Sequence, residues 1–147
     1  MKKNLLLSLI TLALAQPAFA TNWVRIGSNN GTIGNSKATY WYDSDSVKYG
    51  TATFKNGYKT RYVQVLYNLK FEPAKYDDSV GLYVGDEQAV INVSCSSLQK
   101  YRLINIESKT LWKNDKMIFN QKVPRNQDWE TYGNPSLASD LYDTLCN

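Results

Sequence analysis

Apolar and polar residues alternate along most of the chain after residue 20, which is the pattern of β-strands buried on one face. In the longest alternating stretch, residues 60–71, five apolar side chains share one face: Val63, Val65, Tyr67, Leu69 and Phe71. The same pattern predicts further strands at residues 23–26, 38–42, 51–55, 88–95, 101–107 and 116–123.

Turn residues separate these predicted strands. Asn56-Gly57 directly precedes the longest strand and is typical of a tight hairpin turn. Proline and polar residues at 73–78, and polar residues at 113–115, predict that the chain reverses there as well. Because every connection is shorter than a crossover helix requires, we expect neighbouring strands to be antiparallel.

The hydrophobic period changes near the C-terminus. Asn134 followed by Pro135 is typical of a helix start, and Leu137, Leu141 and Leu145 then recur at helical spacing. A helix this short is marginal in water by itself, so it must dock on the sheet.

Two cysteines are placed to hold that helix. Cys95 is in phase with the apolar residues of the 88–95 strand, and Cys146 lies just past the leucine stripe. We therefore predict a Cys95–Cys146 disulfide. The expected fold is α+β: a single antiparallel sheet of about six strands, with one C-terminal α-helix packed on one face and tied by the disulfide.

Residues 1–20 have the pattern of a cleavable export signal. Basic Lys2 and Lys3 precede an apolar run at 5–15, and the small residues Ala18 and Ala20 lie just before the expected cut. Cleavage after Ala20 makes Thr21 the new N-terminus and leaves residues 21–147 as one domain, with no transmembrane segment in the mature chain. The expected location is exported, with the periplasm favoured over the cell surface and the medium.

Composition excludes several kinds of function. Loss of Lys2 and Lys3 reduces 17 basic residues to 15 against 13 acidic ones, an excess too small and dispersed to predict nucleic-acid binding. The chain has no histidine, which removes the commonest general base and the usual zinc and copper ligands. We predict no catalytic residue, metal or cofactor, although a carboxylate-pair hydrolase remains as an alternative.

Aromatic and basic residues supply the candidates for binding. A strand cannot bury Tyr40, Trp41 and Tyr42 together, so either Trp41 or the two tyrosines face away from the helix. An aromatic residue on the face without a helix suits partner binding or self-association, whereas core packing is the alternative. Lys100, Arg102 and Lys109 begin a basic region that is either a solvated strand face or a weak site for acidic macromolecules.

The order of these features resembles a known family. The resemblance rests on five features in chain order: residues 23–26 (WVRI), residues 40–47 (YWYDSDSV), residues 92–95 (NVSC), the Pro135-Ser136 helix start and the terminal Cys146. This layout is similar to the surface-adhesin E family and covers essentially the whole mature chain. The resemblance implies an antiparallel sheet with one disulfide-held helix.

The same resemblance implies a function. It suggests an exported, non-enzymatic binding protein of a Gram-negative bacterium that binds host extracellular-matrix or serum proteins and forms a homodimer. Threonine at position 21, where the family's adhesin has a lipid-accepting cysteine, favours periplasmic residence. The alternative function is a periplasmic structural or stress-related protein with no host ligand.

Overall fold

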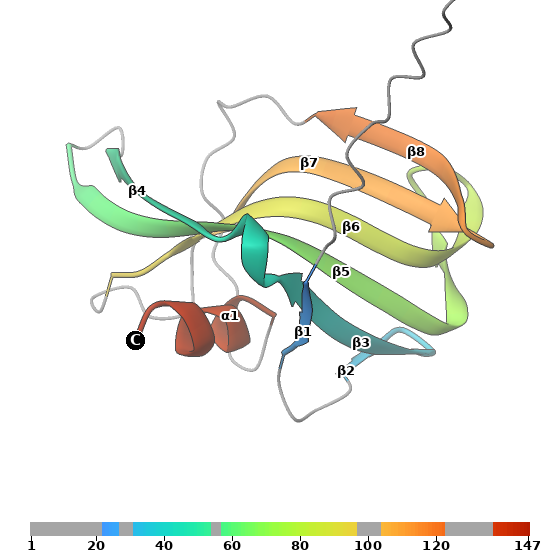
Figure 1. The fold of residues 1–147 in the computed structure, drawn as a ribbon. Coiled ribbons are helices and arrows are strands. Elements are labelled where there is room, and N and C mark those ends of the chain that lie inside the picture. The colour runs from blue at the N-terminus through green and yellow to red at the C-terminus, as the bar shows by residue number, and fades with distance from the viewer. Residues whose placement is uncertain (1–21, 27–30, 54–56, 97–103, 123–136) are drawn as a thin grey trace, which may run out of the picture.

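The computed structural model describes residues 22–26, 31–53, 57–96, 104–122 and 137–147. In these residues eight strands form one antiparallel sheet, and a single helix packs on one of its faces (Figure 1). The strands are β1 (Trp23–Arg25), β2 (Gly31–Ile33), β3 (Ser36–Asp43), β4 (Lys48–Thr53), β5 (Lys59–Asp77), β6 (Leu82–Ser94), β7 (Ile104–Lys113) and β8 (Lys116–Lys122). A 3₁₀ turn (Ser44–Ser46) follows β3, and the helix is α1 (Leu137–Leu145).

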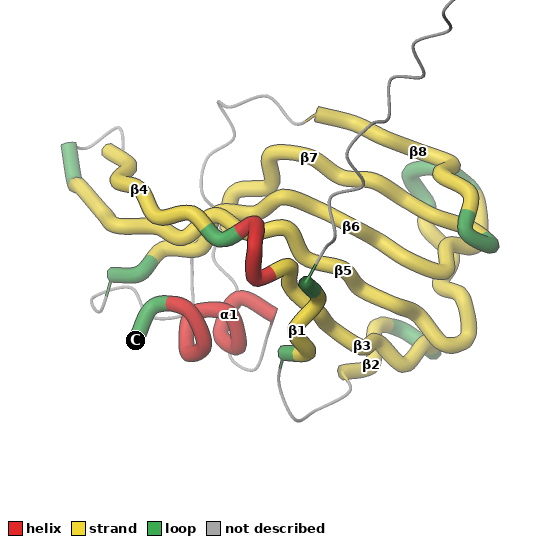
Figure 2. The backbone as a smooth tube through the Cα atoms, viewed as in Figure 1, coloured by secondary structure: helices red, strands yellow, loops and turns green. Residues whose placement is uncertain are grey.

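The strand order is β1-β3-β5-β6-β7-β8, with β2 also pairing with β3 and β4 with β5. Strand β5 organises this sheet because its 19 residues pair with β3, β4 and β6. Strand β5 therefore runs through the middle of the sheet, as the backbone trace shows (Figure 2).

The core lies between the sheet and α1. Val63 and Val65 of β5 are fully buried and sit opposite Val93 and Ile91 of β6. Residues directly opposite in an antiparallel pair share a face, so these side chains form one apolar surface. Ala138, Leu141 and Tyr142 of α1 are buried against this surface in the same cluster.

The predicted disulfide is confirmed. Cys95 follows β6 and Cys146 follows α1, and their Cα atoms lie 5.2 Å apart across the bridge. The bridge therefore joins the C-terminal end of the helix to the sheet, as the apolar phase of Cys95 predicts. The structure describes α1 from Leu137, and the predicted helix start at Asn134 and Pro135 lies outside the described part of the chain. No helix in the described residues is long and apolar enough to span a bilayer.

The predicted reversal at 113–115 is confirmed, and the predicted hairpin before the longest strand is confirmed for its strands and Gly57, while residues 54–56 lie outside the described part of the chain. Strands β4 and β5 pair from Thr53 and Lys59 outward, and Gly57 has φ +81°, which glycine adopts without strain. Asn114 and Asp115, with φ 48° and 60°, connect β7 to β8. These left-handed conformations suit asparagine and aspartate better than larger side chains.

The predicted reversal at residues 73–78 is wrong. Strand β5 continues to Asp77, because an irregularity in its pairing with β6 between Lys70 and Lys75 accommodates Pro73. The chain reverses instead at Asp77–Gly81, where the Asp77 carbonyl accepts a hydrogen bond from the Gly81 N–H at 2.9 Å. Strand β6 therefore begins at Leu82, six residues before the predicted start at residue 88.

The strand predicted at 101–107 is confirmed for residues 104–107 and continues further than predicted, while residues 101–103 lie outside the described part of the chain. Strand β7 is Ile104–Lys113, and its pairing with β6 shifts by one residue around Glu107. This bulge breaks the alternation in the sequence, which is why the pattern ends there although the strand continues.

Candidate functional site

The face of the sheet opposite α1 carries a row of polar and aromatic side chains, which we call the helix-free face. Trp41 of β3, Asn68 of β5 and Gln88 of β6 lie directly opposite one another in the register. Their chain neighbours Tyr42, Tyr67 and Ala89 belong to the core. Because successive side chains in a strand point to opposite faces, this row points away from the helix.

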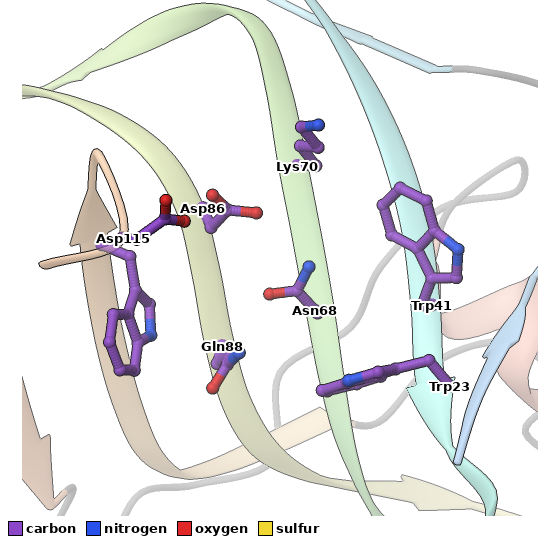
Figure 3. A pocket seen from close by; sticks show the side chains of 8 residues that line it. Trp23, Trp41, Asn68, Lys70, Asp86, Gln88 and Asp115 are labelled. Atoms are coloured by element: carbon purple, nitrogen blue, oxygen red, sulfur yellow. The ribbon is translucent and has the colours of Figure 1, made fainter. Parts of the chain in front are cut away.

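A pocket of about 370 Å³ lies on the helix-free face. Eight residues line it, and we call it the tryptophan pocket: Trp23, Trp41, Asn68, Lys70, Asp86, Gln88, Trp112 and Asp115. In the close-up view the Trp23 and Trp41 rings lie on one side of Asn68, and Asp86 and Gln88 lie on the other (Figure 3). Its volume is within the range of small-molecule sites in proteins.

Strand pairing explains how the pocket assembles. Trp23 lies opposite Asp43 in the β1–β3 pairing. Asp43 comes two residues after Trp41 in β3. Trp112 of β7 lies opposite Asp86 of β6. The tryptophans therefore come from β1, β3 and β7, and the polar side chains come mainly from β5 and β6, which run between β3 and β7.

Two buried polar atoms in this pocket lack a partner. The Oδ1 atom of Asn68 and the Nε1 atom of Trp112 are inaccessible, and neither has a hydrogen-bond partner among the described residues. Most buried polar atoms in proteins are hydrogen-bonded, so such exceptions call for an explanation. One atom is an acceptor and the other a donor, which suits a ligand that offers both groups.

The charged side chains of the pocket are partly exposed. Lys70 Nζ lies 3.3 Å from Glu72 Oε1, and both side chains are more than half exposed. Asp86 and Asp115 contribute two carboxylates. The pocket thus combines flat indole surfaces, two amide groups and a slight excess of negative charge.

A buried polar network lies on the same face, closer to the β4 end of the sheet. Asn92 is 3% exposed; its Oδ1 accepts from Gln64 Nε2 at 3.2 Å, and its Nδ2 donates to Glu107 Oε1 at 2.9 Å. Thr60 and Ser94 share a further bond of 2.9 Å between their hydroxyls. Because these side chains satisfy one another, we assign this network to stability.

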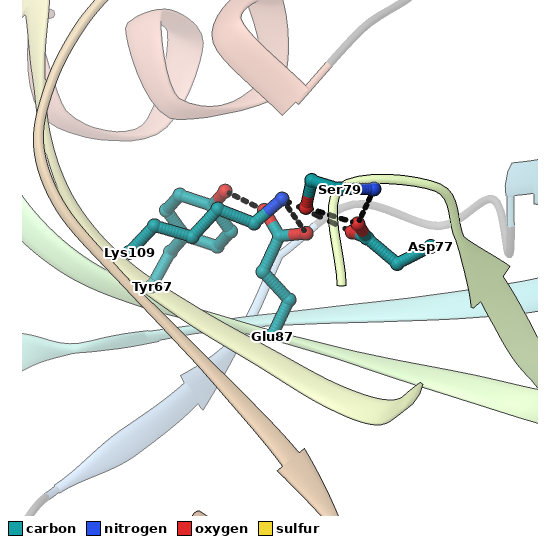
Figure 4. Close-up of polar contacts among 5 residues, drawn as sticks. All are labelled: Tyr67, Asp77, Ser79, Glu87 and Lys109. Carbon is teal, nitrogen blue, oxygen red and sulfur yellow. Dashed lines mark hydrogen bonds and ion pairs between the residues drawn. The ribbon is translucent and has the colours of Figure 1, made fainter. Parts of the chain in front are cut away.

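Lys109 lies on the opposite face, in an ionic cluster (Figure 4). Its Nζ is 3.2 Å from Asp77 Oδ2 and 3.4 Å from Glu87 Oε2, and Glu87 Oε1 accepts from the Tyr67 hydroxyl at 2.7 Å. Asp77 also accepts hydrogen bonds from the backbone and side chain of Ser79. The cluster therefore joins the β5–β6 hairpin end to β7.

The pKa values reflect these contacts. Burial alone would lower the pKa of Lys109, but the Glu87 and Asp77 carboxylates more than offset it and hold the pKa above its usual value. Burial would likewise raise the pKa of Asp77, but hydrogen bonds from Ser79 and Lys109, and the Lys109 charge, lower it. Both groups thus favour their charged forms, as expected for an ion pair that stabilises the fold.

The predicted binding residues lie in different environments in the structure. Tyr42 is buried, and Tyr40 packs against the same core, where burial and then the charge of Asp140 raise its pKa. Of these three aromatic residues, Trp41 is therefore the one that lines a pocket. Lys109 is held in the ionic cluster instead of a basic surface.

Other predicted positions lie outside the described residues: Ala20, Thr21, Lys100 and Arg102. Most lining residues of the pocket were not singled out from the sequence. In the sequence, Asn68 alternates with the apolar residues Tyr67 and Leu69, and this alternation was the available signal that it faces away from the core. Gln88 likewise precedes the apolar Ala89 in its strand, whereas the bulge around Glu107 interrupts the alternation before Trp112. The register that brings these residues together could not be read from the alternation.

The described residues contain no group of three or more His, Cys, Asp or Glu side chains arranged to bind a metal ion. Comparison of the chain with protein-family models, with curated proteins and with solved structures finds no match.

Proposed function

We propose that the protein is an exported, non-enzymatic binding protein whose ligand occupies the tryptophan pocket. The observation that carries this proposal is the convergence of three tryptophans and two unpaired buried polar atoms on one pocket. Indole rings supply large contact areas at low conformational cost, and they are frequent among residues that dominate binding energy. Neither Asn68 Oδ1 nor Trp112 Nε1 is exposed to solvent, so a ligand would pair with them only as their side chains turn toward it, and this pairing would also remove the cost of leaving them unsatisfied.

Binding is favoured over catalysis by the chemistry that the chain offers. The sequence contains no histidine, and both cysteines are joined in the disulfide. The carboxylates of Asp86 and Asp115 keep the hydrolase alternative testable, because a pair of carboxyl groups is what glycoside hydrolysis requires. Product analysis during any binding experiment distinguishes the two functions.

The experiment compares immobilised wild-type protein with two variants. Trp41→Ala removes one wall of the pocket, whereas Tyr83→Ala removes an exposed aromatic residue that does not line it. Laminin, vitronectin, soluble oligosaccharides and proline-rich peptides are tested as ligands. We expect at least one to bind, with affinity lowered by Trp41→Ala and unchanged by Tyr83→Ala. If no ligand distinguishes the two variants, the pocket is not the binding site.

The cellular location of the protein distinguishes host adhesion from a periplasmic function. We expect the mature protein recovered from a Gram-negative host to begin at Thr21, as Edman sequencing or mass spectrometry would establish. Protease treatment of intact cells then tests exposure. Digestion supports a surface adhesin that binds matrix or serum proteins, whereas full protection supports the alternative of a periplasmic structural or stress-related protein.

A further inference from the structure

We infer that the tryptophan pocket binds a short, neutral oligosaccharide whose pyranose rings stack on its indole rings. This inference rests on the proposed binding function and names the class of ligand. Sugar rings present a flat patch of C–H groups bordered by hydroxyls. A site for them therefore needs aromatic surfaces next to amides and carboxylates.

The spacing of the indole rings favours more than one sugar unit. Trp41 lies on β3 and Trp112 on β7, with β5 and β6 between them. These two walls are three strand spacings apart, which corresponds to about 14 Å. This distance exceeds the width of one pyranose ring, so a single sugar would leave one wall uncovered.

The polar atoms between the walls match hydroxyl groups. Asn68 Oδ1 requires a donor, whereas Trp112 Nε1 requires an acceptor. Gln88 offers both functions, and the Asp86 carboxylate accepts. A hydroxyl group donates and accepts, so one class of ligand group satisfies the whole set.

Other ligands for aromatic sites fit these groups less well. A proline-rich peptide can cover indole rings, but its prolines carry no N–H and leave the Asn68 and Asp86 oxygens without donors. Nucleotides and acidic saccharides bring negative charge toward Asp86 and Asp115, while Lys70 is already beside Glu72. The ligand that remains is uncharged and rich in hydroxyls.

The test uses the intact mature protein and isothermal titration calorimetry, with tryptophan fluorescence as a second readout. The probes are chitotriose, cellotriose, glucose, a proline-rich decapeptide and a heparin tetrasaccharide. We expect at least one neutral trisaccharide to bind, more tightly than glucose. Trp41→Ala should weaken this binding by about tenfold, the loss expected for one aromatic contact.

Matched variants separate binding from folding. Trp41→Phe keeps an aromatic ring and should retain part of the affinity, whereas Asn68→Leu should lower affinity while its thermal unfolding remains cooperative. Tyr83→Ala should bind as the wild type does. Circular dichroism of each variant excludes global unfolding as the cause.

The outcomes distinguish the inference from the function on which it rests. If only the peptide or the heparin tetrasaccharide binds, and Trp41→Ala weakens that binding, the saccharide inference fails while the pocket remains the binding site. If no probe responds to the pocket variants, both fail. If a trisaccharide is shortened during incubation, the protein is a hydrolase and the binding assignment is overturned.

Discussion

Side chains one position apart in β3 have different roles because a strand points them to opposite faces. Tyr42 is 9% exposed and lies opposite Tyr67 in the core, whereas Trp41 lies opposite Asn68 in the tryptophan pocket. Asp43, the next residue, is also buried; its side chain accepts hydrogen bonds from the backbone N–H groups of Asn22 and Asp45. Stability and binding in this segment can therefore be tested residue by residue.

We predict that Tyr42→Ala and Trp41→Ala differ in their effect on stability. Tyr42→Ala leaves a cavity in the core and should lower the free energy of unfolding by about 3–5 kcal/mol. Trp41→Ala should lower it much less, because the indole is partly exposed on the helix-free face. Urea denaturation followed by circular dichroism measures both. Equal losses would mean that Trp41 is a core residue.

At the scale of elements, α1 and the β5–β6 hairpin end are attached to the sheet by different means. The helix buries Ala138 and Leu141 in the core and is joined to the sheet by the disulfide. The hairpin end is joined to β7 by the ionic cluster of Asp77, Glu87 and Lys109. The first attachment depends on oxidation and the second on pH.

We predict that the double variant Cys95→Ala/Cys146→Ala is less stable by about 2–5 kcal/mol. The bridge closes a loop of 51 residues, so its loss restores conformational freedom to the unfolded chain. Chemical denaturation measures the change, and hydrogen exchange should show the largest loss of protection in α1. Adding a reductant should destabilise the wild type and leave the double variant unchanged. A reductant effect on the double variant would contradict this explanation.

The ionic cluster predicts a pH-dependent difference between the wild type and Asp77→Asn. Because the folded-state pKa of Asp77 is lowered, its contribution to stability is complete above its ordinary value of 3.8 and is lost as pH falls through the folded-state pKa. Because the pKa of Lys109 is raised, the contribution of Lys109 persists below its ordinary value of 10.5 and is lost as pH rises through the folded-state pKa.

We therefore expect Asp77→Asn to be less stable than the wild type at neutral pH, with the difference shrinking below pH 3.8. Urea unfolding at a series of pH values measures it. Asp78→Asn, at a neighbouring exposed position, is the control and should show little difference. A difference that stays constant into strong acid would assign the effect to something other than the Asp77 charge.

At the scale of the whole molecule, α1 packs on one face of the sheet (Figure 1). The tryptophan pocket lies on the other face. Self-association across the helix-free face would cover the pocket. The proposed uses of this face, ligand binding and dimer formation, should therefore compete.

We predict that a ligand for the pocket shifts any dimer formed across this face toward monomer. Sedimentation velocity at micromolar concentration, with and without the trisaccharide that binds best, measures the shift. Trp41→Ala should weaken the same association, while Tyr83→Ala should not. A dimer that persists in the presence of ligand would form through another surface, such as the β8 edge. If the protein is monomeric in every sample, the helix-free face binds ligand but does not mediate self-association.

Local periodicity determined which elements form and which side of each faces the core. The alternation around Val63 and Val65, the leucine spacing of α1 and the phase of Cys95 were enough to predict an antiparallel sheet, a docked helix and their disulfide. These are short-range properties, because side-chain direction repeats every two residues in a strand and every 3.6 in a helix.

The tertiary structure decided what that periodicity could not. Trp23 and Trp112 are 89 positions apart, and they line one pocket with Trp41 only because β1, β3, β5, β6 and β7 pair in one particular register. The bulge at Glu107 and the irregularity after Lys70 set that register, and neither follows from the alternation. Register depends on pairing between distant segments, and a shift of one residue would move each tryptophan relative to its partners. The sequence therefore predicted a face without a helix, whereas the pairing of its strands made the pocket.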